Sequence, residues 1–128
     1  MKKTIFMDKY PVYTLKLEKN EVEQKNIAEL IEYYKEKIDN HKIAKFISIF
    51  DHYAHTKSLD GEIMEGLLDA KNIIFCFGHA IPNTKMVAAR PRSIGICEFD
   101  KYFIIEFLEA PKEELHALME SWTKALVK

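Results

Sequence analysis

The stretch Asn72-Ile-Ile-Phe-Cys-Phe-Gly-His-Ala-Ile-Pro-Asn-Thr-Lys-Met-Val-Ala-Ala-Arg-Pro91 predicts how the chain is organised. An apolar run from Ile73 to Phe77 stops at Gly78, and a histidine, a proline and an asparagine follow within a few residues. This pattern is typical of a buried strand that ends in a structured turn. Because turn-forming residues and potentially reactive side chains gather here, we expect the functional site at this turn.

Length and composition limit the class of protein. The chain has 128 residues, a common size for one domain, so we expect residues 1–128 to form a single domain. Its 19 basic and 20 acidic residues nearly cancel, which argues against a general nucleic-acid binder. Met1-Lys-Lys is not followed by the apolar run of a signal peptide, and no window is long enough to span a membrane. We expect a cytoplasmic protein in which Cys76 and Cys97 are reduced, buried thiols.

Hydrophobic periodicity predicts the first half of the fold. Residues 10–18 alternate as a half-exposed strand does, and a helix with an apolar stripe follows from a cap at Asn20 to about Asn40. Residues 43–50 are apolar on both alternating sets, which indicates a strand covered on both sides. A short helix is expected over residues 59–70, after a possible cap at Asp60.

The second half continues with the strand of residues 73–77 and its turn. Residues 93–99 and 102–108 predict two strands joined by a tight hairpin at Asp100-Lys101. Pro111 suits the first turn of a second long helix, whose largest buried side chain is Trp122. The expected fold class is α+β: a mostly antiparallel five-stranded sheet with two long helices on one face, in the order β-α-β-β-β-β-α with a short extra helix.

The second face of that sheet needs a cover. Two helices cover only one face, yet several strands are apolar on both. The simplest cover is a second copy of the chain, so we predict a homodimer that buries the second face. The alternative is that the short helix and the loops cover it.

Asp51-His52, Phe77-Gly78, Thr84 and Pro91 are spaced so that the chain resembles the bacterial domain-of-unknown-function 302 family over about Ile47 to Leu108. That family has an Asp-His pair after a strand, then Phe-Gly-Asn-Pro-x-x-Gly-Thr and a later Ala-Pro. Here His79, Ala80 and Asn83 stand where the family has asparagine, proline and glycine. The resemblance implies a compact dimeric α+β fold and no particular activity.

Our leading functional interpretation is a small-ligand-binding or regulatory domain that is not an enzyme. Aromatic and methionine side chains would line a pocket near the Gly78 turn, with a few polar groups at its mouth. The ligand would be small and apolar or anionic. The apolar candidates are Phe50, Tyr53, Phe75, Phe77 and Met86, and the ligand-binding candidates are Asp51, His52, Gly78, His79, Thr84 and Arg90. Arg90-Pro91-Arg92 is either an exposed turn or a holder of a phosphate or carboxylate.

The alternative is an enzyme. His52, His55 and His79 could bind a transition metal, or Asp51 could orient His52 as a general base near the turn. The sequence places no nucleophile there beyond Cys76 or Thr84, and it leaves any catalytic residue and any cofactor open.

Overall fold

A computed structural model describes residues 1–128 as one six-stranded sheet with helices. The strands lie side by side in the order β1-β2-β6-β5-β4-β3, and every neighbouring pair is antiparallel. The strands are β1 (Lys2–Phe6), β2 (Tyr10–Glu18), β3 (Lys45–Asp51), β4 (Asp69–Cys76), β5 (Arg92–Glu98) and β6 (Tyr102–Leu108). The α-helices are α1 (Ile27–Asp39), α2 (His52–Ser58), α3 (Thr84–Ala88) and α4 (Glu113–Lys124), and a 3-10 turn spans Lys19–Glu21.

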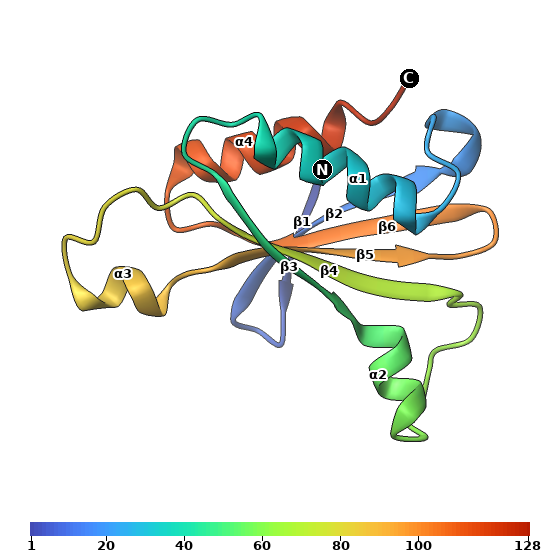
Figure 1. The fold of residues 1–128 in the computed structure, drawn as a ribbon. Helices are drawn as coiled ribbons and strands as arrows, with labels where there is room; N and C mark the ends of the chain where they lie inside the picture. The colour runs from blue at the N-terminus through green and yellow to red at the C-terminus, as the bar shows by residue number, and fades with distance from the viewer.

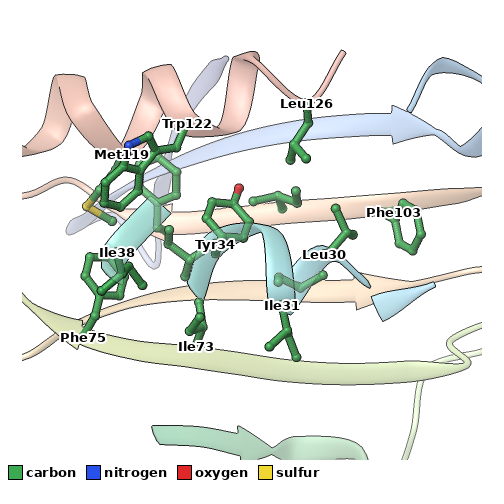
Figure 2. Close-up of a cluster of buried hydrophobic side chains, with 14 of the residues drawn as sticks. Leu30, Ile31, Tyr34, Ile38, Ile73, Phe75, Phe103, Met119, Trp122 and Leu126 are labelled. Atoms are coloured by element: carbon green, nitrogen blue, oxygen red, sulfur yellow. The ribbon is translucent and has the colours of Figure 1, made fainter. Parts of the chain in front are cut away.

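Helices α1 and α4 lie together over one face of the sheet (Figure 1). Figure 2 shows side chains of α1 and α4 meeting those of the strands beneath them, and these side chains belong to one core of 19 buried residues. The two helices are joined by a hydrogen bond of 2.7 Å between the hydroxyls of Tyr34 and Thr123. Burial raises the pKa of Tyr34 far above its usual value, so the phenol stays a neutral partner in this bond. The α+β class, the antiparallel sheet and the two long helices on one face are confirmed.

The sheet has six strands, so the expected five were one too few. The missed strand is β1, which pairs with β2 from Lys2↔Thr14 to Phe6↔Tyr10. Its hairpin turns through Met7 and Asp8, whose φ angles of 54° and 58° lie in the left-handed region. Neither residue is glycine, and the run Ile5-Phe6-Met7 is short, so the usual hairpin signal was absent.

Two predicted helix boundaries were wrong. Helix α1 begins later than expected, because Asn26 and not Asn20 is its cap: the Asn26 side chain accepts a hydrogen bond of 3.0 Å from the Glu29 amide. The short helix is α2, which starts at His52, while most of the segment expected to be helical, residues 59–68, has no regular structure. Positive φ angles at Asp60 (53°) and Gly66 (87°) are incompatible with a helix through that segment.

The second face of the sheet is less covered by helices than the face under α1 and α4. In Figure 1 α2 and the β1–β2 hairpin extend to that side of the sheet, and no long helix lies across it. The face is also more polar than expected, since Asn72, Ser93 and Glu106 stand on it among apolar side chains. Thr14 donates a hydrogen bond of 2.7 Å to Glu106 across β2 and β6. None of the helices is long and apolar enough to cross a bilayer.

Candidate functional site

The turn after β4 is held closed by Arg90, which lies twelve positions after Gly78 in the chain. A side chain at Gly78 would overlap the guanidinium of Arg90, so only glycine lets the two segments approach this closely. Arg90 Nη2 donates a hydrogen bond of 2.9 Å to the Ala80 carbonyl. Asn83 caps α3 by accepting a hydrogen bond of 3.2 Å from the Met86 amide. Specific hydrogen bonds and a close backbone approach therefore hold the turn in its conformation.

A pocket of about 240 Å³ opens between this loop and the start of α4. Figure 1 shows the two segments at the same end of the molecule, beyond the ends of β4 and β5. The pocket has an apolar part and a charged part. The apolar side chains include Ile43, Phe77, Pro82, Met86 and Leu115, and the titratable ones are His79, Arg90, Arg92, Lys112 and Glu114.

The charge of the pocket is unbalanced. Arg90 and Arg92 are the only arginines of the chain, and both line it. No carboxylate oxygen lies within 4.0 Å of either guanidinium. Lys112 and His79 add cationic capacity, whereas Glu114 is the single acidic residue among the lining side chains. The pocket therefore favours an anion.

Arg92 is the side chain most affected by this imbalance. It is partly buried at the start of β5, where Nη2 donates a hydrogen bond of 2.6 Å to the Leu108 carbonyl. Its Nε is buried and has no hydrogen-bond partner. Burial lowers the pKa of this guanidinium from its usual value, because desolvation disfavours the charged form. A partly buried cation without a counterion is costly unless something else supplies the negative charge.

The predicted site residues divide into two groups. Gly78, His79 and Arg90 line the pocket, while Thr84 begins α3 nearby without lining it. Asp51 and His52 lie at the opposite end of β3, because β3 and β4 are antiparallel and pair from Asp51↔Lys71 to Lys45↔Cys76. At roughly 3.3 Å per residue, the strand separates the two groups by about 20 Å.

At that far end, each polar group has a local role. Asp51 Oδ1 accepts a hydrogen bond of 2.9 Å from the Ala54 amide and so caps α2. The rings of His52 and His55 lie 4.5 Å and 5.4 Å from the ring of Phe50. The structure does not bring His52 and His55 together with His79. It also contains no cluster of three or more histidine, cysteine or carboxylate side chains that could hold a metal ion.

Sequence reasoning missed the contribution of α4. Pro111, Lys112, Glu114 and Leu115 come from a segment more than thirty residues after Gly78, and no local signal links them to the turn. His116 on α4 is buried. Its Nδ1 accepts a hydrogen bond of 3.3 Å from the Ala110 amide, and its Nε2 lies 2.9 Å from a carboxylate oxygen of Glu120. These bonds fix the start of α4 and hence one wall of the pocket.

A second, wider hollow of about 540 Å³ lies on the other face of the sheet. The β1–β2 hairpin forms one wall through Ile5, Phe6 and Met7, and Gly95 lies in its floor. The only titratable side chain that lines it is Glu106, which is already hydrogen bonded to Thr14. It therefore has no unpaired buried charge comparable to Arg92.

A family model described as a family of unknown function (DUF6858) matches the chain over residues 1–128. The resemblance to the domain-of-unknown-function 302 family is therefore wrong. Asp51 and Gly78 were among the residues that carried that resemblance, and both have local explanations, a helix cap and a close backbone approach. Such residues recur at caps and turns of unrelated proteins. No curated protein and no solved structure matches the chain.

Proposed function

For this chain, which belongs to the family of unknown function DUF6858, we propose a ligand-binding role in which the pocket at the Gly78 turn holds a small molecule with one anionic group and a short apolar part. The observation that carries the proposal is the partly buried guanidinium of Arg92, which lies in the pocket wall without a carboxylate partner. A carboxylate or phosphate would supply the missing charge and accept hydrogen bonds from the planar guanidinium.

The size and lining of the pocket limit the ligand. A volume of about 240 Å³ is below the usual range of pockets for drug-sized ligands, so the ligand has few heavy atoms. Phe77, Met86 and Leu115 favour an alkyl or aromatic group beside the anion. His79 is exposed at the pocket wall and would donate a hydrogen bond to the same anion in its protonated form.

The enzyme alternative receives less support. Its three histidines lie at two ends of β3 and β4, and the Asp51 carboxylate is occupied by capping α2. A homodimer remains part of the proposal, because the edge strand β3 leaves Ile47, Ile49 and Phe50 exposed in a single copy.

The test is a titration with a graded series of probes. Straight-chain monocarboxylates of increasing length are compared with the corresponding alcohols and amines. Trp122 is the only tryptophan of the chain, and its ring lies 5.6 Å from that of Phe77, so its fluorescence should report binding. We expect saturable binding of carboxylates and none of alcohols or amines.

A pair of variants locates the interaction. Arg92→Met should weaken carboxylate binding about tenfold to a hundredfold, since hydrogen bonds to a charged group contribute about 1.5–3 kcal/mol. Lys101→Gln removes a positive charge from the exposed turn between β5 and β6, at the far end of β5, and should leave the affinity unchanged. Equal affinities for carboxylates and alcohols, or an equal loss in both variants, would exclude the proposed site.

A further inference from the structure

Glu114 is the one acidic side chain that lines the proposed ligand pocket. It lies in the first turn of α4 and is exposed. Its carboxylate oxygens have no nitrogen within 4.0 Å from any of the four cationic groups of the lining, which belong to His79, Arg90, Arg92 and Lys112. The carboxylate is therefore free to interact with a bound molecule.

A ligand whose only charge is negative would make no use of Glu114. Two like charges repel when they are a few ångströms apart, and a pocket of about 240 Å³ cannot keep them well separated. A ligand that also carries a positive group would turn this repulsion into an attraction. An ammonium group close to the anionic group of the ligand meets that requirement.

The position of Glu114 in its helix offers a simpler explanation. An acidic residue in the first turn is stabilised by the helix dipole, whether or not a ligand is bound. Glu113 is in the same turn and is also exposed, but it does not line the pocket. The two neighbours therefore allow a role in the helix to be separated from a role in binding.

We propose that the ligand of this pocket is an α-amino acid with a short apolar side chain, an assignment that rests on the ligand-binding function proposed above. Its carboxylate pairs with the guanidinium of Arg92, and its ammonium group pairs with the carboxylate of Glu114. Its side chain packs on apolar lining residues such as Met86 and Leu115. One molecule then uses the cationic, the acidic and the apolar parts of the pocket.

The connection between β6 and α4 brings the two charged groups to one side of the pocket. Arg92 Nη2 donates its hydrogen bond to the Leu108 carbonyl, at the last residue of β6. The chain continues from there into the start of α4 and reaches Glu114 six positions later. This arrangement suits a ligand whose two charges are attached to a single carbon atom. Pro82 and Met86 come from the facing loop and are placed to contact the rest of the ligand.

Other small molecules leave part of the pocket without a partner. An amine without a carboxylate leaves the guanidinium of Arg92 uncompensated. A dicarboxylate brings a second negative charge towards Glu114 and does not use the apolar lining. The amino acid is the simplest class that avoids both costs.

Three probes with the same carbon skeleton test the assignment in the full chain. They are leucine, 4-methylpentanoate, which lacks the amino group, and 3-methylbutylamine, which lacks the carboxylate. Each is titrated at neutral pH with Trp122 fluorescence and calorimetry as the measurements. We expect leucine to bind about tenfold more tightly than 4-methylpentanoate, because it gains one hydrogen bond to a charged group. The amine should not bind.

Two variants of the first turn of α4 identify the group that recognises the ammonium. Glu114→Gln should lower the affinity for leucine to about that for 4-methylpentanoate and should not weaken the binding of 4-methylpentanoate. Glu113→Gln removes the same charge from the same turn and should keep the tenfold preference for leucine. Both residues are exposed, so neither change should disturb the fold, and thermal unfolding checks this.

The outcomes distinguish this assignment from the proposed function. Equal affinities of the wild type for leucine and 4-methylpentanoate would overturn the amino acid while leaving a carboxylate site in place. A preference for leucine that survives Glu114→Gln, or that is lost equally in Glu113→Gln, would overturn the role of Glu114. A wild type that binds neither compound would contradict the proposed function and, with it, the amino acid.

Discussion

At Gly78 the lack of a side chain allows Arg90 to close the turn. The guanidinium occupies the space that a Cβ atom would fill and bonds to the Ala80 carbonyl. Arg90 is long and flexible, so it can move away if that space is taken. The glycine thus positions one arginine of the pocket, and the other, Arg92, is positioned by β5.

A double-mutant cycle tests this coupling. Gly78→Ala should displace Arg90, with a loss of about 1 kcal/mol or less in the free energy of unfolding, since one hydrogen bond contributes about that much. Arg90→Ala should cost a similar amount. The double variant should cost little more than either single one, because both remove the same contact. Fully additive losses in urea unfolding would show that Gly78 does not act through Arg90.

The Arg92 side chain should add nothing to the stability of the fold in the absence of ligand. Its charge is partly buried without a counterion, which is unfavourable. Arg92→Met removes the charge and keeps a long side chain, so its free energy of unfolding should be within about 1 kcal/mol of the wild-type value or higher. Thermal unfolding in the absence of carboxylate measures this directly. A loss of several kcal/mol would mean that Arg92 is a structural residue whose partner is already inside the chain.

At the scale of elements, most predictions rested on periodicity and were accurate where the pattern was long. The two long helices and the strands near residues 43–50, 73–77, 93–99 and 102–108 are all present. The wrong predictions are those in which a single residue, such as a possible cap, was used to set the start of a helix. Asn20 and Asn26 are both suitable caps by residue type, but the chain forms a 3-10 turn at Lys19–Glu21 and is extended at Val22, so the helix begins only after Asn26.

The two asparagines offer a matched test. Asn26→Ala should lower the free energy of unfolding by about 1 kcal/mol, because it removes the acceptor of the Glu29 amide. Asn20 is exposed in the 3-10 turn, so Asn20→Ala should change the free energy of unfolding by less than about 0.5 kcal/mol. A larger loss of stability in Asn20→Ala than in Asn26→Ala would show that Asn20, and not Asn26, caps the helix.

At the scale of the whole molecule, the strand order decided which site predictions could be joined. The sequence placed polar groups correctly at strand ends, but it does not state whether two strands run parallel or antiparallel. Because β3 and β4 are antiparallel, Asp51 and His52 end far from His79, and the expected single site splits. The part around Gly78 remains, joined by residues of α4 that no local pattern could supply.

NMR mapping of the bound ligand tests whether the pocket at the Gly78 turn is the binding site. The chain of 15.0 kDa is small enough for two-dimensional NMR, in which each backbone amide reports its own surroundings. On titration with a short-chain carboxylate, we predict that the amide signals of Gly78, His79 and Leu115 shift with a common saturation curve, while those of Gly95 and Ser48 stay in place. Shifts confined to Gly95 and the other residues of the second-face hollow, or no saturable shift at Gly78, would show that the Gly78 pocket is not the binding site.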